Sequence, residues 1–191
     1  LAYCLDLASG LSERVPVVFL VYYNVIFACG TEQFLELAAD AGVSGLVIPD
    51  LPIDEVGEFG ESAEKKDVAL CPLAAPTSTD ERIDEIGKAA SGFVYCVSVA
   101  GVTGARETLP PGAVELLRRV RSKVKAPVAL GFGISSAEAA AEAAGEADGV
   151  IIGSKLMQLV AEGGPGKAEE WLGDVREAIS EGARAKVGKR H

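Results

Sequence analysis

Two glycine-bearing segments near the C-terminus carry the clearest chemical signal in this chain. Residues 127–135 (PVALGFGIS) and 147–154 (ADGVIIGS) are both short apolar runs that end in glycine and lead into a helix-like stretch. Glycine at such a turn lets the backbone approach an anion and present free N–H groups, and the first turn of a helix favours negative charge. The sequence therefore predicts a phosphate-binding site built from these two turns, with Gly153 and Ser154 as its strongest candidates.

The composition limits the classes of protein and ligand. The chain has 191 residues, of which 49% are hydrophobic, so it is long enough for one domain with a core and is not typical of disorder. A net charge of -10 argues against a nucleic-acid partner, and no apolar run is long enough to span a bilayer. The four cysteines are scattered, and the single histidine is His191, so the sequence predicts no metal site.

The positions of the apolar runs indicate a repeated strand–helix unit. Runs typical of buried parallel strands occupy residues 16–22, 45–48, 68–73, 93–98, 128–131 and 149–152. Amphipathic stretches predict helices over residues 1–13, 31–41, 54–66, 79–90, 112–124, 135–146, 155–161 and 166–185. Two serines, Ser78 and Ser135, are each followed three residues later by glutamate, a pattern typical of a helix start. Successive strands begin about 26 residues apart, the size of a βα unit.

This repeat predicts an α/β fold with a parallel sheet. An open doubly wound sheet is one interpretation, since six strands suffice for it. The pair of phosphate turns favours the other, a (β/α)8 TIM barrel of the ribulose-phosphate-binding type, in which the last two loops hold phosphate. A barrel of this kind has about 250 residues. We therefore expect residues 1–191 to form a single, partial barrel domain with about six of the eight units, preceded by further strands.

The carboxyl ends of the strands are where a barrel carries its chemistry, and each candidate there has two interpretations. Tyr22 and Tyr95 are either ligand contacts or aromatic residues that fill the barrel. Asp50, between two prolines, is a catalytic acid, a turn former or a helix cap. The glycine-rich loop at residues 99–107 is a mobile lid or a simple connection, and Arg106 is its one cation.

Seven segments, taken together and in this order, resemble the α subunit of tryptophan synthase along almost the whole chain. They are residues 22–27 (YYNVIF), 45–52 (GLVIPDLP), 75–80 (APTSTD), 92–98 (GFVYCVS), 101–104 (GVTG), 131–135 (GFGIS) and 148–154 (DGVIIGS). The resemblance implies a (β/α)8 barrel that cleaves indole-3-glycerol phosphate to indole and glyceraldehyde 3-phosphate by a retro-aldol reaction, in the biosynthesis of tryptophan. It implies no cofactor in this subunit, and a pyridoxal-phosphate-dependent β subunit as partner in an α2β2 complex. The expected location is the cytoplasm, or the plastid stroma in a plant or alga.

The resemblance also implies roles for individual residues. The phosphate would be bound by Gly104, Gly133, Gly153 and Ser154. The rest of the substrate would be contacted by Leu20, Tyr22, Leu73, Tyr95, Thr103 and Phe132, with Thr103 on the mobile loop. The face toward the β subunit would include Asn24, Asp50 and Pro52, which moves Asp50 from acid to interface.

One part of the family pattern has no counterpart in these residues. The family's catalytic glutamate and aspartate belong to the second strand and the loop after it, which we expect to precede Leu1. No residue is assigned to either role, so two further functions stay open. The chain is a catalytically incomplete phosphate-binding barrel that binds and activates a partner, or it belongs to a stand-alone indole-releasing lyase.

Overall fold

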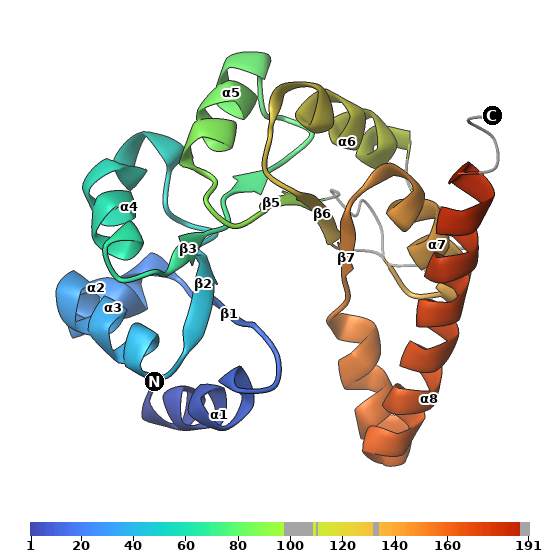
Figure 1. The fold of residues 1–191 in the computed structure, drawn as a ribbon, viewed down its shortest axis with the longest axis horizontal. Coiled ribbons are helices and arrows are strands. Elements are labelled where there is room, and N and C mark those ends of the chain that lie inside the picture. Colours follow the sequence, from blue (N-terminus) through green and yellow to red (C-terminus); the bar gives the residue numbers. More distant parts are fainter. Residues whose placement is uncertain (98–108, 110, 132–133, 188–191) are drawn as a thin grey trace. The chain divides into compact units, whose positions relative to one another are not determined.

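The computed structural model describes residues 1–97, 109, 111–131 and 134–187, and side chains of this part except those of residue 111 and residues 182–187. Strands and helices alternate along it (Figure 1). The strands are β1 (Val17–Leu20), β2 (Val43–Val47), β3 (Ala69–Leu70), β4 (Leu73–Ala74), β5 (Val94–Val97), β6 (Val128–Gly131) and β7 (Gly149–Ile151). The helices are α1 (Ala2–Ser12), α2 (Tyr23–Cys29), α3 (Thr31–Asp40), η1 (Ile53–Glu55), α4 (Val56–Glu64), α5 (Asp80–Ala89), α6 (Pro111–Lys123), α7 (Ala137–Glu146) and α8 (Ser154–Val187).

The described chain groups into two compact units. The first contains Leu1–Leu73, Thr79–Tyr95 and Val124–Ala126, and the second contains Ala74–Ser78, Cys96–Lys123 and Pro127–His191. The boundary passes through the short strands β4 and β5. The single domain over residues 1–191 stays a prediction.

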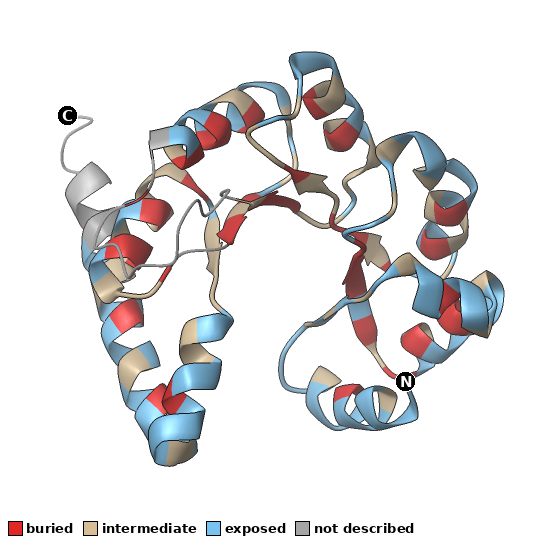
Figure 2. Ribbon diagram, turned by 180° about the vertical axis from the view of Figure 1, so that it is seen from behind, coloured by how far each residue is buried: buried red, intermediate tan, exposed pale blue. Residues whose placement is uncertain are grey.

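The first unit is built on a three-stranded sheet in the order β1-β2-β3. Both pairings are parallel, with Leu20 opposite Val47 and Leu46 opposite Leu70. The core lies between this sheet and its helices, where Phe34, Leu35 and Ile26 are fully buried. Figure 2 shows that buried residues lie on the strands and on one side of the helices, as expected for a core between sheet and helices. The sheet thus has one face covered by helices.

In the second unit β6 and β7 pair in parallel, with Gly131 opposite Ile151. The long helix α8 is two helices joined at Gly164, whose φ of 76° is non-helical, and Pro165 follows it. Figure 1 shows the two parts of α8 running in opposite directions on either side of this bend. The sequence predicted this break, because proline cannot continue a helix that leads into it.

The third apolar run departs from its prediction, because it forms two short strands in place of one. The amide of Cys71 donates to the carbonyl of Leu46 on β2, whereas the carbonyl of Pro72 accepts from Tyr95 on β5. Proline has no N–H, so the chain changes its hydrogen-bonded neighbour at this residue. The run therefore divides into β3 and β4.

The predicted helix starts at Ser78 and Ser135 are wrong by one residue. The cap of α5 is Thr79, whose Oγ1 accepts from the amide of Arg82. The cap of α7 is Ser136, whose Oγ accepts from the amide of Ala139. In both sequences two hydroxyl residues are adjacent, and spacing alone does not tell which of them caps.

Helix α2 is the element that the sequence did not predict. Its seven residues, YNVIFAC, include β-branched and aromatic side chains of low helix propensity, and its N-cap Tyr22 makes no side-chain cap. Gly30, with a φ of 89°, separates α2 from α3. The group that stabilises the start of α2 comes from a distant part of the chain, as described below.

Candidate functional site

The two faces of β1 differ in what they contact. Val17 and Phe19 pack against the helix-covered core, whereas Val18 and Leu20 alternate with them and are exposed. Because side chains alternate across a strand, Val18 and Leu20 share the opposite face of the sheet. Leu20 is 61% exposed, and Tyr22, two residues further, is 58% exposed. Two of the predicted substrate contacts in the first unit, Leu20 and Tyr22, therefore lie at the carboxyl end of β1 and are accessible to a ligand.

The same face continues across β2 and β3 with small residues. The pairing places Val18 opposite Gly45 and Gly45 opposite Ala69. A Cβ at Gly45 would lie 3.0 Å from the carbonyl oxygen of Ala69 and 3.6 Å from the sulfur of Cys71. Glycine is required here because the strands approach closely. Leu20 projects from the same face of the sheet as Gly45.

Asp50 holds the start of α2. Its Oδ1 accepts a 2.7 Å hydrogen bond from the amide of Tyr23, 27 residues earlier in the chain. This carboxylate supplies the N-terminal cap that Tyr22 does not provide, and negative charge at that end is favoured by the helix dipole. Of the interpretations open from the sequence, the structure supports the helix cap, although the helix is a different one from the helix that follows Asp50.

The ring of Tyr23 provides a second attachment for α2. It meets Phe59 of α4 edge to face, with ring centroids 5.9 Å apart and an interplanar angle of 78°. Phe59 is buried in the core of the unit. The first residue of α2 is therefore held by its backbone and by its side chain, and this fixes the backbone next to Tyr22. No local pattern in the sequence indicates either contact.

Tyr95 and Leu73 lie close to each other through the backbone of Pro72. The amide of Tyr95 donates to the Pro72 carbonyl at 2.9 Å, and Leu73 is the next residue. Tyr95 is buried, and burial raises the pKa of its phenol above the ordinary value near 10. It therefore stays neutral at physiological pH. Its burial matches the barrel-filling interpretation, while the exposure of Tyr22 does not.

The residues predicted to face a partner lie in two neighbouring segments. Asn24 is exposed on the first turn of α2, and Asp50 and Pro52 are exposed after β2, with Pro52 as the N-cap of η1. The hydrogen bond between Asp50 and Tyr23 brings the two segments together. These three residues are thus adjacent to the segment that carries Tyr22.

Gly153 and Ser154 lie in the second unit, between β7 and α8. Ser154 is the first residue of α8, and the carbonyl of Gly153 accepts from the amide of Met157. Both residues are exposed, and a Cβ at Gly153 would meet no atom within 4 Å. The first turn of a helix leaves its amides without backbone partners, so this turn presents donors toward open space. The other predicted contacts, Thr103, Gly104, Phe132 and Gly133, lie outside the described residues.

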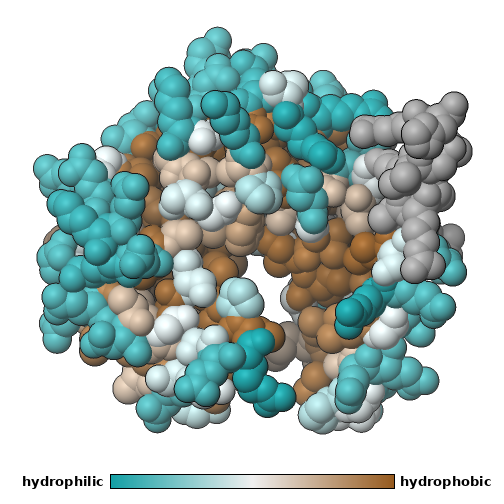
Figure 3. All heavy atoms as spheres, in the orientation of Figure 1, coloured by the Kyte–Doolittle hydropathy of each residue, from teal (hydrophilic) through white to brown (hydrophobic). Residues whose placement is uncertain are grey.

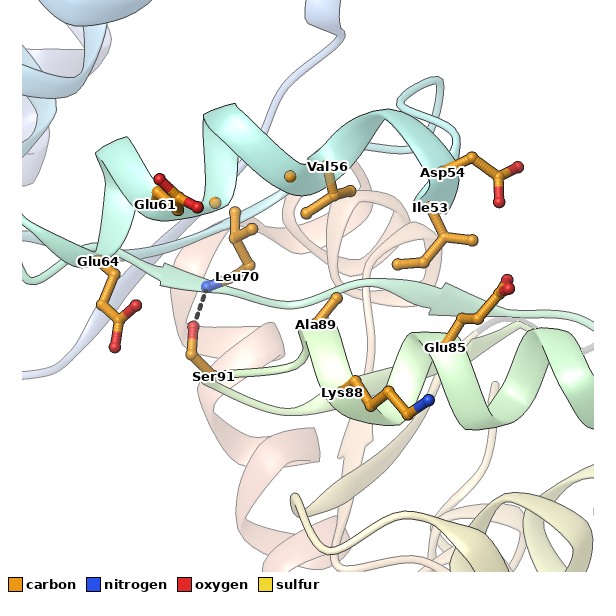
Figure 4. Close-up of a pocket in the computed structure, with 12 residues that line it drawn as sticks. Ile53, Asp54, Val56, Glu61, Glu64, Leu70, Glu85, Lys88, Ala89 and Ser91 are labelled. Carbon is orange, nitrogen blue, oxygen red and sulfur yellow. Dashed lines mark hydrogen bonds between the residues drawn. The ribbon is translucent and has the colours of Figure 1, made fainter.

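A groove of about 500 Å³ lies elsewhere on the first unit, between α4 and α5 (Figure 4). Its floor includes Val56, Leu70 and Ala89, and carboxylates such as Glu61 and Glu85 surround it. Leu70 belongs to the helix-covered core, so the groove is on the helix side of the sheet. No predicted site residue lines it. The helices around it present mainly hydrophilic atoms, at the top and upper left of Figure 3.

Among the described residues, no group of three or more His, Cys, Asp or Glu side chains is arranged to hold a metal ion. No helix in the described part of the chain is long and apolar enough to cross a membrane.

Comparison with known proteins identifies relatives along nearly the whole chain. The model of the family "Tryptophan synthase alpha chain" matches residues 1–185. The tryptophan synthase alpha chain of Clostridium beijerinckii is 48% identical over 160 residues, which are 84% of this chain and 61% of that protein. That of Methanopyrus kandleri is 44% identical over 183 residues, 95% of this chain and 66% of that protein.

Solved structures agree. A structure of the tryptophan synthase α2β2 complex from Pyrococcus furiosus superposes with a TM-score of 0.83 at 35% identity, covering 94% of this chain and 73% of that one. A structure of the tryptophan synthase α subunit from the same organism superposes with a TM-score of 0.82 at 34% identity. The match covers 94% of this chain and 74% of that one. The parallel strands and alternating helices are therefore those of a partial (β/α)8 barrel, as the sequence predicted.

The chain spans less than two thirds of the length of the curated relatives it matches first. The family match nevertheless covers all but the last residues, and it agrees with the glycine turns and strand ends described above. This chain belongs to the tryptophan synthase alpha chain family.

Proposed function

We propose that this chain is the α subunit of a tryptophan synthase and binds indole-3-glycerol phosphate, whose cleavage yields indole and glyceraldehyde 3-phosphate. The observation that carries the proposal is the family match over residues 1–185, which includes every residue predicted to contact substrate. The family's reaction also needs an anion site and an apolar site, and the chain offers candidates for both.

The phosphate end of the substrate is assigned to the second unit. Gly153 and Ser154 open the first turn of α8 with free amides, a hydroxyl and open space for an anion. Gly104 and Gly133 are proposed to complete the set by family resemblance. Since the chain is acidic overall, an anion is held here by backbone donors and the helix dipole.

The indole end is assigned to the first unit. Leu20 and Tyr22 expose apolar and aromatic surface at the end of β1, which suits a flat heteroaromatic ring. Leu73 and Tyr95 are proposed to contribute to the same site, with Phe132 and Thr103 added by family resemblance. The phenol of Tyr95, whose pKa burial raises above its ordinary value, is proposed to donate a hydrogen bond to the substrate.

We propose further that the chain needs no cofactor of its own and works with a β subunit that carries pyridoxal phosphate. Asn24, Asp50 and Pro52 would form part of the surface toward that subunit. The related structure from Pyrococcus furiosus is an α2β2 complex, which supports this choice of partner. The proposed location is the cytoplasm, or the plastid stroma in a photosynthetic eukaryote.

A second function is favoured by the state of Asp50. Of the described residues at the carboxyl ends of β1 and β2, Asp50 is the carboxylate, and it accepts a hydrogen bond from Tyr23. It is therefore occupied as a cap and is a poor general base. The second proposed function is that the chain binds substrate and activates its partner without cleaving the substrate.

One experiment separates these functions. The chain is incubated with indole-3-glycerol phosphate, with and without a β subunit, while indole release, substrate affinity and β-subunit turnover are measured. Indole release would establish the α reaction in this chain. Binding with faster β turnover and no indole would establish the activating function. A chain that binds neither indole-3-glycerol phosphate nor glycerol 3-phosphate would contradict the proposal.

A further inference from the structure

Asp50 has a contact that its proposed place on a partner surface does not explain. One of its carboxylate oxygens lies 2.7 Å from the amide nitrogen of Tyr23. Charge-assisted hydrogen bonds of this length are among the stronger ones in proteins. The bond joins the first residue of α2, which follows β1, to the segment that follows β2. It therefore links the carboxyl ends of two neighbouring strands, where the indole end of the substrate is assigned.

The position of Tyr22 depends on that bond. The backbone ladder between β1 and β2 ends with the amide of Val21, which donates to the carbonyl of Val47. Tyr22 comes next, in an extended conformation with φ of -76° and ψ of 144°, and Tyr23 begins the helix. Tyr22 therefore lies between two fixed backbone points, the Val21 amide and the Tyr23 amide.

Among the described residues, the side chain of Tyr22 has few neighbours. It is 58% exposed and makes no side-chain cap to α2. The backbone on either side therefore sets the direction in which the side chain of Tyr22 leaves the chain, since the exposed ring has few packing contacts of its own. The Tyr23–Phe59 ring contact holds the helix axis, whereas the bond to Asp50 holds the backbone nitrogen next to Tyr22.

We propose that Asp50 is a positioning residue for the indole end of the substrate, which acts by fixing the Tyr23 amide and thereby the backbone of Tyr22. This inference rests on the proposed function. The inference concerns only the indole end of the substrate, since the phosphate end is assigned to Gly153 and Ser154.

The test uses the full chain with two ligands, indole-3-glycerol phosphate and glycerol 3-phosphate, which lacks the indole. Asp50→Ala should weaken binding of the first about tenfold, or ~1.4 kcal/mol, and leave binding of the second unchanged. Asp50→Asn should retain most of the affinity, because asparagine also accepts from a helix amide. Asp54→Asn, an exposed carboxylate paired with Arg82, is the matched control and should leave both affinities unchanged.

The amide signal of Tyr23 provides a readout that does not depend on ligand. It should shift and exchange faster with solvent in Asp50→Ala, and remain close to its original position in Asp50→Asn. Unchanged affinity for indole-3-glycerol phosphate in Asp50→Ala, or equal loss for both ligands, would overturn the inference. If the unaltered chain binds neither ligand, the proposed function fails, and this inference fails with it.

Discussion

Val128 and Asp148 exchange two hydrogen bonds at the start of strands β6 and β7. The amide of Val128 donates to Asp148 Oδ2 at 2.9 Å, and the amide of Asp148 donates to the carbonyl of Val128 at 2.8 Å. Arg121 adds a 3.2 Å contact to Asp148 Oδ1. Asp148 thus joins the amino ends of two parallel strands, at the opposite end of β7 from Gly153. Its role is therefore structural.

Asp148→Ala is therefore expected to destabilise the fold and to spare ligand binding. It leaves the partly buried amide of Val128 without its acceptor, which costs about 2 kcal/mol for a bond to a charged group. Urea denaturation measures the loss. Asp174→Ala, on the exposed surface of α8, is the control and should change stability by less than about 0.5 kcal/mol. A loss no larger than that of the control would show that the Asp148 bonds contribute little.

Gly153→Asp is expected to remove the affinity for glycerol 3-phosphate. A carboxylate beside the assigned anion site repels phosphate, and we expect a loss of at least about tenfold, ~1.4 kcal/mol. The substitution is a clean test because a Cβ at this position meets no atom within 4 Å. Gly153→Ala should therefore bind like the unaltered chain. Calorimetric titration measures both, and unchanged binding by Gly153→Asp would remove Gly153 from the phosphate site.

The cysteines are expected to fall into two reactivity classes. Cys4 is exposed and should react readily with an aromatic disulfide reagent at pH 8, whereas Cys71 and Cys96 are buried. Burial raises the pKa of Cys96 to about 12 and also raises that of Cys71. Both buried thiols should react only after unfolding, since the thiolate is the reactive form. Rapid labelling of Cys96 in the native chain would contradict this.

The same shifts predict lower stability at high pH. Between pH 9, where thiols of the unfolded chain ionise, and about pH 12, the folded chain keeps the proton of Cys96. The folded state then binds more protons than the unfolded state, so the free energy of unfolding falls as the pH rises. Tyr95, whose pKa is also raised, acts in the same direction above pH 10. Urea midpoints at pH 8, 10 and 11 should decline, and Cys96→Ala should reduce the decline.

Helix α1 is expected to promote self-association. Tyr3, Leu7 and Leu11 recur every four residues, so they form one apolar stripe, and all three are exposed. The replacement of Tyr3 and Leu7 together by lysine should lower the average mass in sedimentation experiments at high concentration. Ser9→Lys, on the polar side of the helix, is the control. Equal masses for all three proteins would show that the stripe is not an association surface.

The N-cap of α7 is Ser136, one residue after the predicted Ser135, and substitution of the two serines tests this assignment. Ser136→Ala should cost about 1 kcal/mol, because Ser136 Oγ accepts from the Ala139 amide. Ser135→Ala should reduce the stability of the fold by much less. Thermal denaturation of the two variants measures the difference. The opposite order would restore Ser135 as the cap.

The positions of most elements followed from local pattern, and the exceptions share a cause. Strand β6 has the predicted bounds, Val128–Gly131, because a buried parallel strand is a continuous apolar run between polar turns. The run at residues 68–73 divided because Pro72 has no N–H to continue one ladder. Proline was visible in the sequence, but the second hydrogen-bonding neighbour, β5, was not.

The sequence by itself determined most of the strands and helices, the glycine turns and the family, since these depend on residue type, spacing and order along the chain. The tertiary structure decided which candidates are exposed and which are capped. Tyr22 and Tyr95 are alike in sequence, yet one is exposed and the other is buried. Helix α2 exists because a carboxylate 27 residues away accepts its first amide, and no local pattern contains that bond.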